Sequence, residues 1–168
     1  MVLTKPELIG SLQNEVRILL HLASKVSPEM VDYRPAPKQR SILELLRYLS
    51  IMGPGLVRAS KAGFSPEAWT KATAEADARN FEQTLAAIAG HADLYASMLA
   101  DWSDADFRTE IEMFGSKTTR GAFIVSLVLG GCAAYRTQLF LYLKANGRDE
   151  LNTMNLWGGM DPPPAPAS

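Results

Sequence analysis

Residues 81–102 read FEQTLAAIAGHADLYASMLADW, and the apolar positions in this stretch decide the fold class. They recur at alternating steps of four and three residues, the spacing that places side chains along one face of an α-helix. The positions are Phe81, Leu85, Ile88, Ala92, Tyr95, Leu99 and Trp102. The stretch is therefore predicted to form one long helix that buries one face in a core.

Two further helices are predicted before this stretch. The first begins after Thr4, because Thr4, Pro6 and Glu7 are typical of a capped helix start. Its apolar stripe comprises Ile9, Leu12, Val16, Leu19, Ala23 and Val26. The second begins after Ser41, and its stripe comprises Ile42, Leu45, Leu49, Met52 and Leu56. Residues 53–55, Gly-Pro-Gly, are expected to kink or interrupt the second helix, because proline lacks a backbone donor.

The other segments are assigned from their turn and cap residues. Residues 64–79 are expected to form a connector that packs through Trp69, with one short capped turn. Residues 103–117 are expected to form a short extended excursion or hairpin, with a helical turn as the alternative. The last helix is predicted from Thr118 or Thr119 to residues 146–147, Asn-Gly. Its stripe comprises Ile124, Val128, Gly131, Tyr135, Gln138 and Tyr142.

Four long helices predict an all-α protein, an antiparallel four-helix bundle with short extra helices and an extended C-terminal tail. The chain has 168 residues, which fits one domain. We place this domain at residues 1–161. Residues 162–168, PPPAPAS, are expected to be a mobile Pro-rich tail, because prolines offer no backbone donors to a helix or sheet.

Charge and composition exclude several kinds of partner. The chain has 17 Lys and Arg against 18 Asp and Glu, so no strong field is available to attract nucleic acid or an anionic membrane. The longest apolar run, residues 121–135, is shorter than the ~20 residues that cross a bilayer. A single cysteine and a start without a signal-peptide pattern predict a cytoplasmic protein.

The supply of soft or borderline metal ligands is small. It consists of two histidines, His21 and His91, and one cysteine, Cys132. None of the three is paired with another histidine or cysteine at helical spacing. Both histidines lie beside the predicted core stripes, so we expect them to be partly exposed and structural.

Three segments of the chain resemble one known family. They are YRPAPKQRSILELLRYLS at residues 33–50, CAAYRTQLFLYL at 132–143 and LNTMNLWGGMDPP at 151–163. They resemble the DinB-like superfamily, which includes YfiT-type metalloenzymes and thiol-dependent S-transferases. The resemblance implies a DinB/YfiT-type four-helix bundle and a homodimer.

The sequence departs from this family at its metal site. The family pattern places one histidine on the second helix, in ELLxHL, and two on the last helix, in HxxxHRxQ. Tyr48, Gly131 and Tyr135 stand at these three positions here. A phenol with a pKa near ~10 must lose its proton to bind an ordinary divalent ion well. The resemblance therefore predicts a DinB-like chain without a bound metal or other cofactor.

Six residues are predicted to line a small-molecule pocket in the centre of the bundle: Tyr48, Gly131, Cys132, Tyr135, Gln138 and Trp157. For each of these residues, a role in packing is the alternative to a role in binding. The two tyrosines could simply fill the volume that an ion and its imidazoles would take. Gly131, next to Gly130, could serve close helix packing or leave space for a ligand, because glycine inside a helix is unfavourable.

The other members carry similar alternatives. Cys132 is expected to behave as a small hydrophobe, since nothing near it in the sequence would lower the pKa of its thiol. Gln138 is expected to be a structural bridge or a pocket group. Trp157 is expected to cover the pocket as a lid or to complete the core. The neighbouring Arg136 points away from the stripe and is predicted to form an ion pair or an interface.

Two classes of function follow. The first is a small-molecule-binding or interaction module that works without metal. The alternative is an enzyme with a metal-independent or rearranged site, related to the thiol-dependent S-transferases or to metal-dependent hydrolases. No catalytic residue is assigned.

Overall fold

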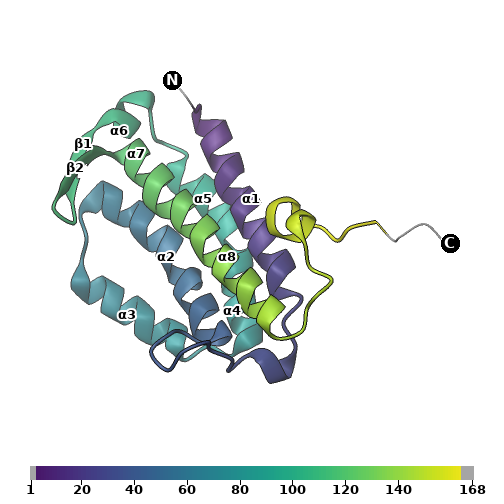
Figure 1. Ribbon diagram of the computed structural model, residues 1–168. Coiled ribbons are helices and arrows are strands. Elements are labelled where there is room, and N and C mark those ends of the chain that lie inside the picture. Colours follow the sequence, from purple (N-terminus) through teal and green to yellow (C-terminus); the bar gives the residue numbers. More distant parts are fainter. Residues whose placement is uncertain (1–2, 164–168) are drawn as a thin grey trace.

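The computed structural model describes residues 3–163 and confirms the predicted all-α bundle. Four long helical segments form it (Figure 1). They are α1 (Lys5–Ala23), α2 (Ile42–Ala62), the in-line pair α4 (Phe81–Ala89) and α5 (His91–Leu99), and the continuous run of α7 (Arg120–Phe123), η2 (Ile124–Leu129) and α8 (Gly130–Ala145). The long helix predicted at residues 81–102 is therefore two helices, which meet at Gly90.

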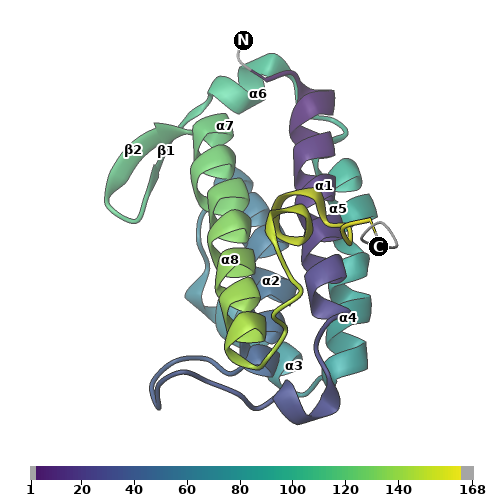
Figure 2. The same ribbon diagram turned by 45° about the vertical axis from the view of Figure 1, so that its right-hand side comes forward.

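The directions of the four segments follow from a crossover helix. In Figures 1 and 2, α1 and α7–α8 run one way, whereas α2 and α4–α5 run the other way. Helix α3 (Pro66–Asp77) lies beside α2 and leads the chain back to the start of α4. The sequence predicted only a connector with one short turn here. The segment forms a helix of 12 residues because Ser65 caps it and Pro66 opens it.

Several short elements complete the fold. A hairpin of β1 (Glu110–Met113) and β2 (Ser116–Thr119) extends beside α7, as the sequence suggested. The remaining short elements are η1 (Pro28–Met30), α6 (Asp104–Arg108) and η3 (Met154–Gly158). The predicted helix ends are confirmed: Thr4 and Ser41 form capping boxes and Thr119 caps α7.

The predicted interruption of α2 is wrong, because the helix continues from Ile42 to Ala62 through Pro54. Pro54 has no N–H, so it leaves the carbonyl of Ser50, four residues earlier, without its helical donor. The Nε2 atom of His91 lies 2.9 Å from this carbonyl oxygen. Because a carbonyl only accepts, Nε2 must carry the proton and donate it. An imidazole from α5 thus replaces the hydrogen bond that proline removes.

This contact also corrects the prediction for His91. We expected a partly exposed side chain, but His91 is only 5% exposed. It lies on the buried row of α4–α5 with Ile88, Tyr95 and Leu99. Burial above all lowers the pKa of His91 to about 4; the hydrogen bond to Ser50 opposes this shift. His91 is therefore neutral at physiological pH.

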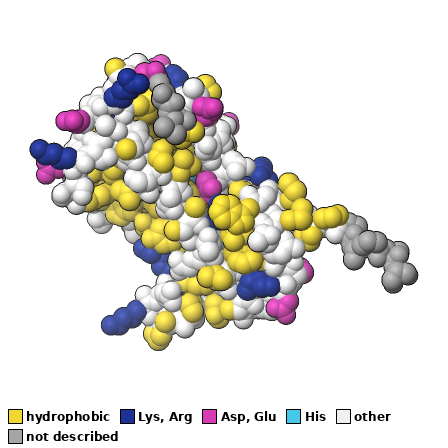
Figure 3. Space-filling view, turned by 45° about the horizontal axis from the view of Figure 1, so that its top comes forward, with side chains coloured by type: hydrophobic (Ala, Val, Ile, Leu, Met, Phe, Trp, Pro, Cys, Tyr) yellow, Lys and Arg dark blue, Asp and Glu magenta, His cyan; other side chains and the backbone are white. Residues whose placement is uncertain are grey.

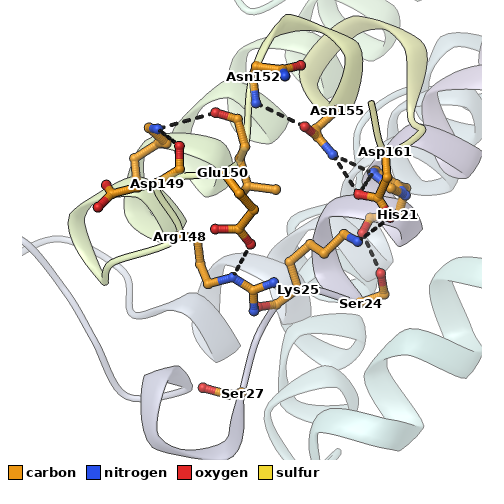
Figure 4. Close-up of polar contacts among 12 residues, drawn as sticks. His21, Ser24, Lys25, Ser27, Arg148, Asp149, Glu150, Asn152, Asn155 and Asp161 are labelled. Carbon is orange, nitrogen blue, oxygen red and sulfur yellow. Dashed lines mark hydrogen bonds and ion pairs between the residues drawn. The ribbon is translucent and has the colours of Figure 1, made fainter. Parts of the chain in front are cut away.

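The C-terminal segment is attached to α1 by polar contacts (Figure 4). Asn155 is fully buried, and its Nδ2 lies 3.1 Å from His21 Nε2 and 2.9 Å from Asp161 Oδ1. Asp161 also pairs with Lys25 at 2.7 Å. The segment therefore docks as predicted, although through Asn155 rather than through an aromatic side chain. Residues 164–168 of the predicted Pro-rich tail lie outside the described residues.

The helical run Arg120–Ala145 is long and apolar enough to cross a membrane by length and composition. In the bundle it packs against both α1 and α2, with Phe123, Ile124, Val128 and Leu139 buried at the contact. Only 22% of its most apolar window is buried, however. The helix therefore combines a core face with an unusually apolar outer face. The compartment and the exclusion of membranes stay predictions.

Candidate functional site

A groove of about 510 Å³ lies between α2 and the η2–α8 run, with α3 and the hairpin at its sides. We call it the aromatic groove. Its lining residues are Tyr48, Met52, Leu56, Phe64, Trp69, Phe114, Ser126, Leu127, Gly130, Gly131 and Tyr135. Five of these eleven are aromatic and no member is charged. The groove thus offers ring faces and a few hydroxyl groups to a ligand.

The three positions that replace the family's histidines lie together in this groove. Tyr48 comes from α2, whereas Gly131 and Tyr135 lie one turn apart on α8. The rings of Tyr48 and Tyr135 meet edge to face, with centroids 5.1 Å apart. This geometry is favourable for aromatic pairs, so each ring fixes the other. Three members of the predicted pocket thus share one site.

The surroundings of Tyr48 keep its hydroxyl group neutral. Burial, followed by the neighbouring Tyr135, raises the pKa of Tyr48 to about 12. The guanidinium of Arg40 lies 4.1 Å from the centre of the Tyr48 ring and opposes this rise. At physiological pH the Tyr48 phenol therefore keeps its proton and can both donate and accept a hydrogen bond.

These residues do not fit the divalent metal site that the family resemblance describes at these positions. A protonated phenol is a poor ligand, and Gly131 offers no side chain. Among residues 3–163, no group of three or more His, Cys, Asp or Glu side chains is placed to hold an ion. The chemistry available at the groove is apolar contact and hydrogen bonding.

Comparison with known proteins identifies the architecture. A DinB-like protein of Bacillus subtilis, YjoA, has a solved structure that matches 86% of this chain and 94% of its own, with a TM-score of 0.66 and 19% sequence identity. The fold is DinB-like. No protein-family model matches the sequence, and no curated protein matches it.

Within this DinB-like bundle, the two glycines of α8 have different surroundings. A Cβ atom on Gly131 would lie 3.2 Å from Cε of Met52, so this glycine allows α2 and α8 to approach closely. A Cβ on Gly130 would meet only the carbonyl of Val125 at 3.7 Å. A π-helical turn, η2, directly precedes them. Such turns are frequent at functional sites, and this one lies at the groove wall.

The other three predicted pocket residues do not line the groove. Cys132 is partly buried, and burial raises the pKa of its thiol to about 12, which disfavours a nucleophilic thiolate. Gln138 donates to the Tyr142 hydroxyl, which donates to the backbone carbonyl of Arg40 at 3.2 Å. Gln138 is thus part of a structural bridge from α8 to the segment before α2.

Trp157 is not part of the core, because 69% of its surface is exposed. It lies on the α1 side of α8, where the guanidinium of Arg136 is 5.4 Å from its ring. Arg136 is itself buried and pairs with Glu15 at 2.8 Å, which confirms the predicted ion pair. An aromatic residue of η3 therefore packs over a buried arginine instead of covering the predicted pocket.

Eight of the eleven groove residues were not identified as site residues from the sequence, and three of these are aromatic: Phe64, Trp69 and Phe114. The ring of Trp69 packs edge-on against Tyr48, with centroids 6.3 Å apart, and at a tilt against Phe64, with centroids 5.7 Å apart. The ring centroids of Phe114 and Phe64 are 5.3 Å apart, so the hairpin closes one side of the groove. They come from separate segments, and nothing in the local sequence shows that they meet.

Phe114 carries a signal of its own. It occupies the hairpin turn with a φ of 52°, a left-handed conformation that bulky residues rarely adopt. Asn or Asp usually precedes glycine in such turns. The side chain is also 61% exposed, so burial does not explain it. The turn therefore accepts strain to hold an aromatic ring at the mouth of the groove.

Proposed function

We propose that this DinB-like protein is a binding module whose aromatic groove takes a small, uncharged aromatic molecule without a metal ion. The observation that carries the proposal is the replacement of the family's three ligand positions by Tyr48, Gly131 and Tyr135 within a groove of about 510 Å³. This volume is in the range of small-molecule sites.

The chemistry of the groove supports an aromatic ligand. Ring faces and edges from Trp69, Phe64 and Phe114 favour stacked or edge-to-face contact with another ring. The neutral hydroxyl of Tyr48 supplies one hydrogen-bond donor and acceptor that can orient a polar substituent. A phenol-like molecule satisfies both requirements.

Titration with p-cresol tests the proposal, because this probe has an aromatic ring and one neutral hydroxyl. Binding is measured by calorimetry for the parent protein, for Phe114→Asn and for Trp157→Phe as the matched control. Phe114→Asn is expected to weaken binding about fivefold, since an aromatic contact at the groove is lost. Trp157→Phe is expected to leave it unchanged, because Trp157 lies outside the groove. Equal affinities in all three proteins would count against the groove.

Elemental analysis of tag-free protein tests the metal-free part. We expect no stoichiometric zinc or nickel, because the donor set at residues 48, 131 and 135 does not suit these ions. Stoichiometric metal whose removal abolishes p-cresol binding would overturn the proposal in favour of a rearranged metal site.

We also propose that two copies of the chain associate through the outer face of the α7–α8 run. Val125 and Leu141 of this run are 41% and 58% exposed. Hydrophobic side chains gather in patches on the face shown in Figure 3. Exposed apolar clusters of this kind mark contact surfaces. Sedimentation equilibrium is expected to show a dimer that Leu141→Glu weakens and Thr70→Glu, on α3, does not; a monomeric parent contradicts this.

A further inference from the structure

A second hollow lies on a neighbouring flank of α2, next to the aromatic groove. It has a volume of about 590 Å³ and is enclosed by α2, α3 and the junction of α4 and α5. We call it the arginine pocket. Phe64 and Trp69 line both hollows, so they form the wall between them. The pocket contains none of the three positions that replace the family's metal ligands.

The charged side chains of this pocket are Arg58, Arg79 and Glu75, so positive charge is in excess. Within residues 3–163, neither arginine forms an ion pair. The described contacts include no side-chain hydrogen bond for Arg58, while Arg79 donates one, to Ser50 Oγ at 2.8 Å. A guanidinium has five N–H donors, and most of these remain available to a ligand.

Arg58 and Arg79 both lie near His91 in the lining of the pocket. Both lie close enough to His91 for their charges to lower the pKa of its imidazole, in addition to the effect of burial. His91 lines the pocket and donates its Nε2 proton to the Ser50 carbonyl, so it contributes no competing positive charge. Two positively charged side chains thus lie near a neutral imidazole in the lining of this pocket.

The remainder of the wall is made of small side chains. Alanine or glycine stands at seven lining positions of α2, α3 and α4–α5: Gly55, Ala59, Ala62, Ala68, Ala72, Ala87 and Gly90. Larger side chains at these positions would fill the space between the helices. With Trp69 they make an apolar chamber beside the two arginines.

We propose that the arginine pocket binds a small organic anion, whose carboxylate or phosphate group pairs with Arg58 and Arg79 and whose apolar body lies against the alanine-rich wall and Trp69. Arginine is suited to this role because its planar fork matches both anions with paired hydrogen bonds. The site is independent of the proposed aromatic groove and would persist if that function were wrong.

Calorimetric titrations with phenyl phosphate and benzoate test the proposal, with benzyl alcohol as the neutral probe. The variants are Arg58→Gln, Arg79→Gln and, as the matched control, Arg40→Gln. Arg40 lies over Tyr48 at the aromatic groove, so it reports binding at the wrong hollow. Arg58→Gln is the cleaner of the two pocket variants, because it breaks no described side-chain hydrogen bond.

We expect each pocket variant to weaken binding of at least one anionic probe by about tenfold or more, which is the usual effect of losing a charged hydrogen bond. Arg40→Gln is expected to bind like the parent, and benzyl alcohol is expected to bind more weakly than the anions. The proposal is overturned if both pocket variants bind both anions like the parent, if Arg40→Gln loses the binding, or if the parent binds neither anion below about 10 mM.

Discussion

The two hollows beside α2 differ in the charge of the side chains that line them. In the aromatic groove, burial raises the pKa of Tyr48 to about 12 and leaves the site uncharged. In the arginine pocket, burial lowers the pKa of His91 to about 4 and keeps it neutral, whereas the exposed Arg58 and the half-buried Arg79 bring positive charge to the lining. Helix α2, with Phe64 and Trp69, thus borders one uncharged site and one positively charged site. The two hollows therefore differ in the charge of their side chains rather than in their shape.

The largest effect is expected from a substitution that displaces α2, because residues of α2 line both hollows. Gly53 faces Tyr95 of α5, and a Cβ atom at this position would lie 1.8 Å from the Tyr95 hydroxyl oxygen. We expect Gly53→Ala to lower the free energy of unfolding by more than about 3 kcal/mol, because the clash lies in a buried contact. Urea unfolding measures this loss. Tyr95→Phe in the same chain should recover part of it, and an unchanged midpoint for Gly53→Ala alone would contradict the packing.

Low pH tests the neutral state of His91, because protonation would add a positive charge to the lining of the arginine pocket. The unfolded state protonates His91 near 6.5, whereas the folded state does so near 4. Between these values the unfolded chain binds more protons, so stability falls as pH falls, by up to about 3 kcal/mol for this residue. Urea unfolding of the parent and of His91→Gln should show a smaller loss in the variant. Parallel curves for the two proteins would refute the low pKa.

The link between Pro54 and His91 gives a smaller, coupled effect. His91→Leu leaves the Ser50 carbonyl without a donor, which should cost about 2 kcal/mol of unfolding free energy. In the Pro54→Ala background the new backbone N–H can donate to this carbonyl, so the same substitution should cost about 1 kcal/mol less. A double-mutant cycle measures the difference. Strict additivity would show that the imidazole does not replace the missing helical bond.

The smallest effect separates stability from binding in the groove. Phe114→Asn should raise the unfolding free energy by about 0.5 kcal/mol or leave it unchanged, because asparagine accepts the left-handed turn conformation. It should nevertheless weaken p-cresol binding while leaving phenyl phosphate binding intact. Thermal unfolding and the two titrations provide the test. A variant that loses stability and keeps its affinity for p-cresol would reverse the interpretation.

Much of the bundle was predictable because it depends on local patterns. The stripes of α1 and α8 and the caps at Thr4, Ser41 and Thr119 act within one helical turn, so their sequence signals are nearly complete. The proximity of Tyr48 to Tyr135 followed from a family pattern that already encodes helix packing.

The failures all depend on contacts between distant segments. Continuity of α2 through Pro54 requires a donor from His91, 37 positions later by their residue numbers, and periodicity cannot show this. The exposure of Trp157 depends on Asn155 filling the buried position beside His21. The aromatic groove needs Trp69, from a helix that the sequence assigned as a connector, and Phe114, from a hairpin that the sequence offered as one alternative without showing that it meets Trp69.

The most direct test of the central claim is an NMR titration of tag-free, EDTA-treated protein with p-cresol. The account predicts saturable shifts of the backbone amide signals of Gly130, Gly131 and Tyr135, with the same affinity before and after chelation. Shifts that vanish after EDTA treatment and return with added zinc, or saturable shifts confined to residues outside the groove, would contradict it.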